Sequence, residues 1–237
     1  MEQDLTSGSV FRNVIYFSLP YFLSYFLQTL YGMADLFIVG QFDGVASTTA
    51  VSIGSQVMHM LTVMIVGLAM GATVSIGQSI GAGDKKRASV FVGNTVTLFM
   101  GISLVLAVLL LFFVKPIVSV MSTPAEAVSG TAAYLTICFL GIPFITAYNV
   151  ISSIFRGLGD SKSPMYFIAV ACAVNIILDY LFIGFFHLGA SGAALGTTLS
   201  QACSVLFALI AIKRKQTGLS LSCLLYTSPS PRDSTSS

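Results

Sequence analysis

Long runs of apolar residues, separated by short segments rich in glycine, proline and charge, make up most of the chain. A helix needs about 20 apolar residues to cross the hydrocarbon core of a bilayer, and every run reaches that length. We expect each run to form one membrane-spanning helix. The six predicted spans cover residues 14–39, 46–79, 89–114, 127–154, 164–186 and 191–212. The pattern therefore predicts an all-α polytopic membrane protein with six transmembrane helices.

The composition supports this prediction and excludes other classes. Hydrophobic residues make up 55% of the 237 residues and charged residues only 8%, against about a quarter charged residues in ordinary soluble domains. The formal net charge is +2, and no basic run is longer than three residues. Nucleic-acid binding needs a clustered basic patch. We therefore expect contact with membrane lipid and no nucleic-acid partner.

Basic residues fall almost entirely on one side of the predicted spans. Nine Lys and Arg residues share the side of the N-terminus, and one lies on the other side. By the positive-inside rule, residues 1–13, the loops after spans two and four, and the segment after span six are cytoplasmic. The protein is thus predicted to be a multi-pass protein of the plasma (inner) cell membrane. The nine are Arg12, Lys85, Lys86, Arg87, Arg156, Lys162, Lys213, Arg214 and Lys215, and the one is Lys115.

The C-terminal residues differ from everything before them. Residues 223–237 are polar and rich in serine and proline, and they resemble the translation of a transposase sequencing adapter. We interpret them as a non-native tail, with a disordered natural tail as the alternative. Residues 213–222 are then the start of a cytoplasmic linker, and the natural protein is expected to be longer.

Two acidic residues lie inside predicted spans, Asp35 in the first and Asp179 in the fifth. An ionised group is costly in the bilayer and usually marks a functional site, and no span offers a Lys or Arg as a partner. Two neighbouring carboxyls without a cation favour binding of a proton. With neutral oxygens beside them they would instead hold a hard monovalent cation such as Na⁺. For Asp35, near the end of its span, an interfacial acid reached by water is the alternative.

Several polar residues are placed to complete such a site. Asn175 lies four residues before Asp179 and Tyr31 four before Asp35, so each shares a helix face with its acid. Thr197 and Thr198 in span six could add a hydroxyl ligand. The alternatives are an interhelical hydrogen bond for Asn175 and bonds within the helix for the threonines. His59 in span two could relay protons or simply bond to a neighbouring helix.

Proline, glycine and cysteine suggest how the spans pack. Pro20 interrupts the first span and is either a hinge or a tolerated kink. Glycines in spans two and six predict close helix packing inside the bundle. Cys138, Cys172 and Cys203 lie in apolar runs, and the sequence has no CxxC pair, so we expect no cofactor and no resident metal. The glycines are Gly71, Gly77, Gly81, Gly189, Gly192 and Gly196.

Five segments together resemble the multidrug and toxic compound extrusion (MATE) transporters, over about residues 10 to 216. The order, the spacing and the predicted loop side of the segments all agree. They are 35–40 (DLFIVG), 77–84 (GQSIGAGD), 155–164 (FRGLGDSKSP), 175–179 (NIILD) and 188–194 (LGASGAA).

The resemblance implies two six-helix lobes that export cationic or amphipathic compounds in exchange for Na⁺ or H⁺ by alternating access. This chain is similar to the N-terminal lobe, so the missing C-terminal lobe would be its partner and a small-molecule drug or organic cation its substrate. Asp35 matches the first-span acid, and Asn175, Asp179 and Thr197 match the other groups of the N-lobe cation site. The substrate and the choice between Na⁺ and H⁺ stay open.

Parts of the sequence are also compatible with three other functions. Gly-x-Gly-Asp also occurs in intramembrane aspartyl proteases, but residues 81–84 and 157–160 lie in loops beside basic residues, so turn and cap chemistry is preferred and no enzyme is expected. A flippase for lipid or saccharide precursors would need Lys or Arg in its spans, and the predicted spans contain none. A structural membrane protein would leave the two acids unexplained.

Overall fold

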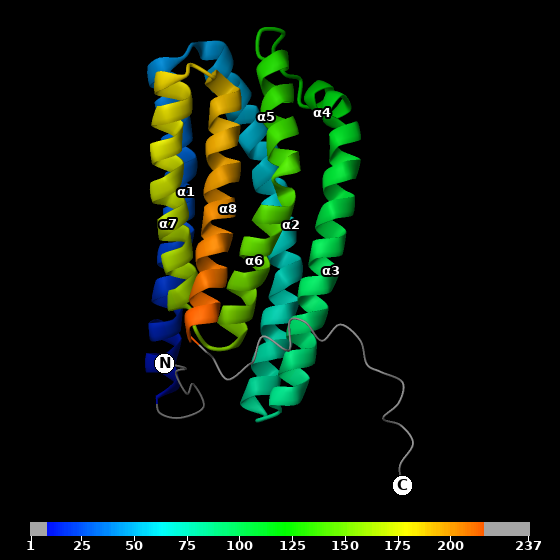
Figure 1. The fold of residues 1–237 in the computed structure, drawn as a ribbon, viewed down its shortest axis with the longest axis vertical. Coiled ribbons are helices and arrows are strands. Elements are labelled where there is room, and N and C mark those ends of the chain that lie inside the picture. The colour runs from blue at the N-terminus through cyan, green and yellow to red at the C-terminus, as the bar shows by residue number, and fades with distance from the viewer. Residues whose placement is uncertain (1–8, 216–237) are drawn as a thin grey trace.

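The computed structural model describes residues 9–215, and every regular element in this range is helical (Figure 1). Five elements are long and apolar enough to cross a membrane: α1, α2, α3, α8, and α7 continued by a π-helix. The bent pair α5 and α6 provides a sixth. The elements are α1 (Val10–Phe42), α2 (Val45–Gly81), α3 (Lys85–Phe112), α4 (Val114–Val120), α5 (Val128–Leu140), α6 (Ile142–Gly157), α7 (Lys162–Asp179), the π-helix (Tyr180–Phe185) and α8 (Gly189–Lys215).

The fourth predicted span, 127–154, is not one straight helix. It is broken into α5 and α6, which meet at an angle of 50°. Pro143 has no N–H and cannot continue the hydrogen bonding of α5, so α6 restarts with this proline in its first turn. Gly141 lies at the break, where a Cβ atom would come within 2.6 Å of Thr198 Cγ2. The small residue therefore lets the break pack against α8.

The fourth span also ends later than predicted. The apolar run stops at residue 154, but α6 continues through Gly157, so Arg156 lies in its last turn rather than in a loop. The loop after the third span likewise contains the short helix α4. The predicted spans themselves contain no basic residue, but α6 extends beyond its apolar run and carries Arg156 in its last turn.

The helices pack in two connected groups. In Figure 1, α1, α7 and α8 form one group, and α2, α3 and α6 form the other, with α5 between α8 and α2. Small residues allow close contacts, but not all at the predicted positions. In α2, Gly71 and Gly81 have no neighbour within 4 Å of a Cβ position, whereas Gly54 packs directly on the Tyr134 ring. In α8, the tight contacts predicted at Gly192 and Gly196 are present.

The turns after α2 and α6 share one hydrogen-bond pattern. The Asp84 N–H donates to Ser79 O at 2.9 Å, and the Asp160 N–H donates to Phe155 O at 2.9 Å. Each turn has a glycine at positive φ, Gly83 at 73° and Gly159 at 84°, which is the Schellman arrangement that ends a helix. The aspartates then cap the next helix, because Asp84 Oδ1 accepts from Arg87 N and Asp160 Oδ1 accepts from Ser163 N. The two Gly-x-Gly-Asp segments are therefore helix stops and starts.

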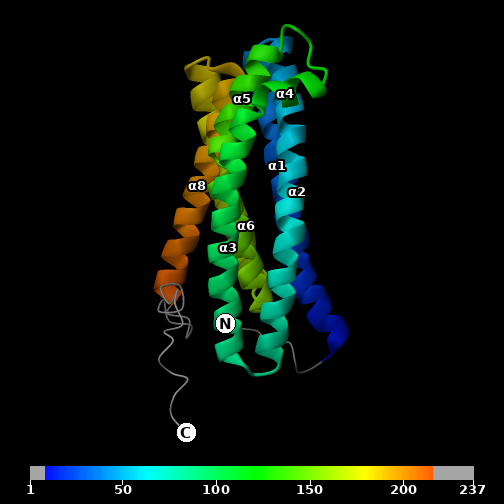
Figure 2. The same ribbon diagram turned by 90° about the vertical axis from the view of Figure 1, so that its right-hand side faces the viewer.

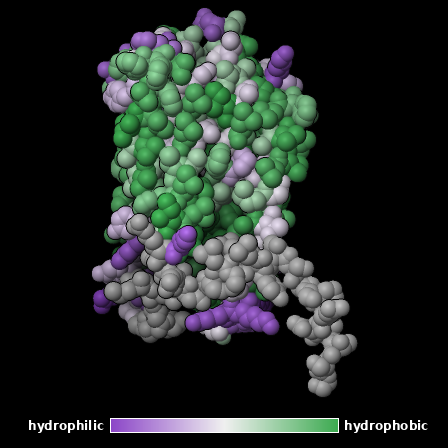
Figure 3. All heavy atoms as spheres, viewed as in Figure 1, coloured by the Kyte–Doolittle hydropathy of each residue, from purple (hydrophilic) through white to green (hydrophobic). Residues whose placement is uncertain are grey.

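The surface carries an apolar belt between two polar ends. Figure 3 shows hydrophobic side chains around the middle of the bundle and hydrophilic ones toward both ends. The turns after α2 and α6 and the end of α8 lie at the same end as residue 10 (Figure 1). The predicted assignment of this end to the cytoplasm stays a prediction. The tail 223–237 and most of the linker 213–222 lie outside the described residues.

Candidate cation-coupling site

The two intramembrane acids meet inside the bundle. Asp35 extends from α1 and Asp179 from the end of α7; Asp35 is 4% exposed and Asp179 is 0% exposed. The Asp35 carboxyl lies within side-chain contact of Asp179 and Asn175. Thr197 on α8 donates its hydroxyl to Asp35 Oδ2 at 3.1 Å. Three helices thus bring together the four residues predicted as a cation site, and the interfacial alternative for Asp35 does not fit its burial.

Local backbone geometry places Asp179 at this point. Asp179 is the last residue of α7, and a π-helix, Tyr180–Phe185, follows it directly. The Phe186 N–H donates to Leu181 O, five residues earlier, at 3.0 Å. Such wide turns are rare and occur often at functional sites. Asn175 lies one α-helical turn before Asp179 and is also fully buried, so its amide and the carboxyl share a face.

Gly196 makes the space that the Asp179 carboxyl occupies. A Cβ atom on Gly196 would collide with Asp179 Oδ1 and would lie 3.6 Å from Asn175 Nδ2. The sequence predicts Gly196 only as a packing residue. Its position directly before Thr197, on a helix that contacts both α7 and α1, indicates that Gly196 lies at the acid pair.

The site is rich in oxygen atoms that lack donors. Asp35 Oδ1, both Asp179 oxygens and Asn175 Oδ1 are buried without a hydrogen-bond partner. Two carboxylates can accept but not donate, so they form a hydrogen bond with each other only when a proton lies between them. The described part of the chain supplies no ion pair to either acid. This arrangement fits a proton, or a hard monovalent cation held by carboxylate, amide and hydroxyl oxygens.

The accessory residues are placed differently from one another. Tyr31 lies beside Gln201, a buried α8 residue with an unpartnered Oε1 atom that the sequence reading did not single out. Thr198 faces Gly141 at the break between α5 and α6, not the acids. His59 is exposed on α2, and the structure gives it no contact with the acid pair.

Pro20 lies inside α1, fifteen residues before Asp35, and is buried. The helix continues through it, and the Ser24 hydroxyl donates to Pro20 O at 2.8 Å. Figure 2 shows the first turns of α1 leaning away from the bundle. Its predicted role as a hinge stays a prediction.

Comparison with known proteins gives a consistent picture. The family model described as MatE matches residues 20–181. The chain is 33% identical over 213 residues to the "Probable multidrug resistance protein YpnP" of Bacillus subtilis (strain 168), covering 90% of this chain and 48% of the relative. It is 29% identical over 213 residues to the "Multidrug export protein MepA" of Staphylococcus haemolyticus (strain JCSC1435), covering 90% and 47%.

A solved structure gives the same result for the fold. The structure described as "Crystal structure of MATE in the bent conformation" superposes with a TM-score of 0.85 at 27% identity, over 94% of this chain and 50% of the other. The chain spans about half the length of the curated relatives it matches.

Proposed function

Because the chain belongs to the MatE family of membrane transporters, we propose that it is the N-terminal lobe of a secondary active efflux transporter whose coupling ion binds between Asp35 and Asp179. The family consists of transporters rather than enzymes. One observation supports the proposal above the others. Two buried carboxyls lie beside each other without a cationic partner among residues 9–215, and three of their four oxygens accept no hydrogen bond.

The cycle follows from the charge of this site. Without a bound cation, two ionised carboxylates repel each other across α1 and α7, so the site favours taking up Na⁺ or H⁺. Binding neutralises that repulsion and changes how α1, α7 and α8 pack. A coupling ion shifts the equilibrium between two lobe conformations only if it binds one conformation more tightly than the other. Release of the exported compound on the outside and of the ion on the inside then gives antiport by alternating access.

The proposed substrates are cationic or amphipathic small molecules. The relatives' printed descriptions refer to multidrug resistance and multidrug export, which supports a broad small-molecule class without choosing a compound. We propose that the second lobe needed for a transport pathway is the part of the relatives that this chain does not match.

Ion binding by the purified chain tests the proposal. Calorimetric titration with NaCl at constant ionic strength should show Na⁺ uptake or proton release in the wild type, and Asp35→Asn and Asp179→Asn should each remove it. Asp43→Asn is the matched control, because Asp43 is exposed at the end of α1. Binding that persists unchanged in both site variants would refute the site.

Transport is tested with the gene that contains this reading frame in an efflux-deficient bacterium. We expect ethidium accumulation in Asp35→Asn and Asp179→Asn cells to reach the level of the empty vector. Wild-type efflux in both variants would contradict the assigned role of the two acids. A wild type that gives no efflux above the empty vector, with variants that are only more stable, would favour the structural-protein alternative.

A further inference from the structure

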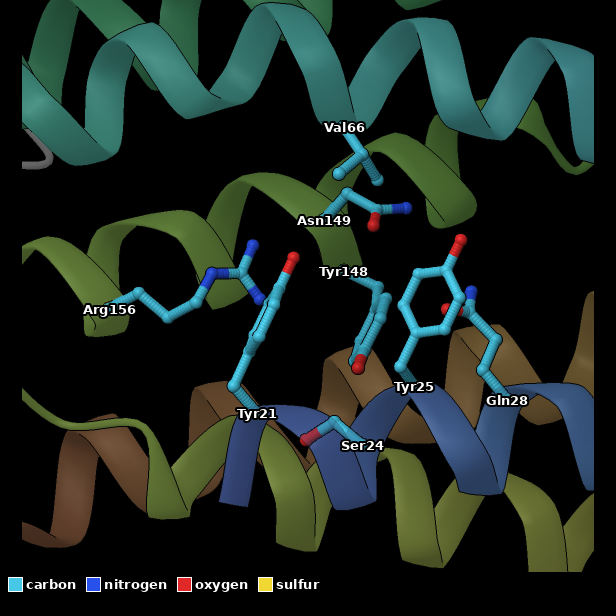
Figure 4. A pocket seen from close by; sticks show the side chains of 8 residues that line it. All are labelled: Tyr21, Ser24, Tyr25, Gln28, Val66, Tyr148, Asn149 and Arg156. Carbon is cyan, nitrogen blue, oxygen red and sulfur yellow. The ribbon is translucent and has the colours of Figure 1, made fainter. Parts of the chain in front are cut away.

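A polar cavity lies between α1, α2 and α6, away from the acid pair. Its volume is about 30 Å³, close to the ~30 Å³ that one water molecule occupies in the liquid. Figure 4 shows the guanidinium of Arg156 beside the Tyr21 ring, with Tyr148 and Tyr25 farther along. The polar residues of its lining are Tyr21, Ser24, Tyr25, Gln28, Tyr148, Asn149 and Arg156.

Arg156 has no anionic partner in the described residues. Its guanidinium carbon lies 5.3 Å from the centroid of the Tyr21 ring, and Nη2 donates to Ser153 Oγ at 3.0 Å. Its Nε is buried and has no hydrogen-bond partner. Arg156 as a whole is half-buried, but a buried N–H without an acceptor is costly. The unpartnered Nε–H therefore indicates a place for a hydrogen-bond acceptor, and the positive charge favours an anionic one.

The chemistry of the lining narrows that acceptor. A planar guanidinium matches the oxygens of a phosphate in a two-point hydrogen bond, and tyrosine hydroxyls can donate further bonds. The cavity admits only an oxygen-bearing part of a ligand at its present volume. On α1, Leu19 is 65% exposed and Phe22 is 69% exposed, and both flank Tyr21 in the sequence. A polar recess lined by a helix whose outer face carries exposed apolar residues suits a phosphate head group with hydrocarbon attached.

We propose that the cavity at Arg156 binds a phosphate-type oxyanion, supplied either by the head group of an anionic lipid or by a soluble phosphate. This site is separate from the cation-coupling site, because Tyr21 lies fourteen residues before Asp35 on the same helix, about 21 Å at 1.5 Å per residue. Oxyanion binding can therefore be measured separately from ion coupling.

The experiment compares two lipids on the purified full chain in a neutral detergent. Dioleoyl phosphatidylglycerol and dioleoylglycerol differ by the phosphate-bearing head group, and their binding is measured by native mass spectrometry and by thermal shift. The wild type should bind the phospholipid more tightly. Arg156→Gln should weaken that binding by about tenfold or more, the usual size of a charged hydrogen bond, and Arg156→Lys should fall between them.

Arg87→Gln provides the matched control. Arg87 also lies over an aromatic ring, that of Phe91 at 5.7 Å, but it is exposed at the same end of the bundle. Its loss should change binding less than twofold. Sodium phosphate is then added in competition: displacement of the lipid identifies a soluble oxyanion as able to fill the site, and resistance to displacement identifies the lipid head group.

The proposal is overturned if the wild type binds both lipids equally and sodium phosphate stabilises it no more than sodium chloride does. This comparison uses only the wild type, so it does not depend on whether a variant folds. The proposal is equally overturned if Arg87→Gln loses as much affinity as Arg156→Gln.

Discussion

Gly196→Ala should disturb the acid pair through a single added methyl group. The new Cβ would collide with Asp179 Oδ1 and lie 3.3 Å from Asp179 Cγ. The neighbouring atoms belong to a buried carboxyl at the end of α7, which is held between α1 and α8. Either the Asp179 side chain moves away from Asp35 or α7 and α8 separate.

The size of the effect follows from two opposing terms. Adding a methyl group to a packed interior costs about 1–3 kcal/mol, while replacing glycine by alanine inside a helix gains about 1 kcal/mol. Gly71→Ala in α2 is the matched control, because nothing lies within 4 Å of its Cβ position, so only the gain applies. Gly196→Ala should thus be about 1–3 kcal/mol less stable than Gly71→Ala, or several degrees in melting temperature at roughly 2–4 °C per kcal/mol.

A thiol-reactive dye follows unfolding, because the buried Cys138 and Cys172 react only when the chain unfolds, whereas the exposed Cys203 reacts before the melt and sets the baseline. Each variant is melted in NaCl and in choline chloride. The wild type and Gly71→Ala should have a higher melting temperature with Na⁺, since a ligand that binds only the folded state stabilises it. If the ion is H⁺, their melting temperature should instead change when the pH is lowered. Gly196→Ala should lose that response. An unchanged ion response together with a melting temperature equal to that of Gly71→Ala would refute the packing argument.

Two other substitutions test neighbouring contacts. Thr197→Val removes the hydroxyl that donates to Asp35 Oδ2, so it should lower the free energy of unfolding by about 1 kcal/mol and weaken Na⁺ binding in calorimetry. Thr136→Val, at an exposed hydroxyl on α5, should leave Na⁺ binding unchanged. Equal effects of the two substitutions on Na⁺ binding would contradict the assignment of Thr197 to the site. Gly141→Ala places a methyl group against Thr198 at the α5–α6 break and should lower the melting temperature by the overpacking cost of about 1–3 kcal/mol. Relief of that loss in Gly141→Ala/Thr198→Ala, which lacks both clashing atoms, Cγ2 and Oγ1, would attribute it to this contact, and no relief would count against it.

Hydropathy was sufficient to locate the spans, because each must satisfy its backbone hydrogen bonds as a helix within an apolar stretch. The family model and the matching structures confirm the predicted helical membrane fold. The break at Gly141 was missed since an apolar run that contains Gly-Ile-Pro has the same hydropathy whether it is straight or bent. Arg156 was assigned to a loop for a related reason: a hydropathy window stops at a charge, but a helix continues while its hydrogen bonds do.

The acids were predictable from the scarcity of charge, whereas their surroundings were not. Asp35 and Asp179 stand out in any apolar span, and helical spacing adds Asn175. Which residue of α8 meets them depends on the rotation of that helix, and adjacent Thr197 and Thr198 cannot be distinguished by type. The structure directs Thr197 to Asp35 and Thr198 to Gly141. Gly196 and Gln201 were missed because their importance lies in contacts with other helices.

Helix α1 connects the two sites of the lobe. Its C-terminal half carries Asp35, and its N-terminal half carries Tyr21 against Arg156, one residue after Pro20. A displacement of α1 that accompanies ion binding at Asp35 would therefore also alter the Arg156 cavity, since α1 forms one wall of it. Coupling between binding sites is reciprocal. If the ion changes the affinity for the oxyanion by some factor, an oxyanion that holds Tyr21 near Arg156 must change the affinity for the ion by the same factor. If α1 instead bends freely at Pro20, that factor is one and the two sites bind independently.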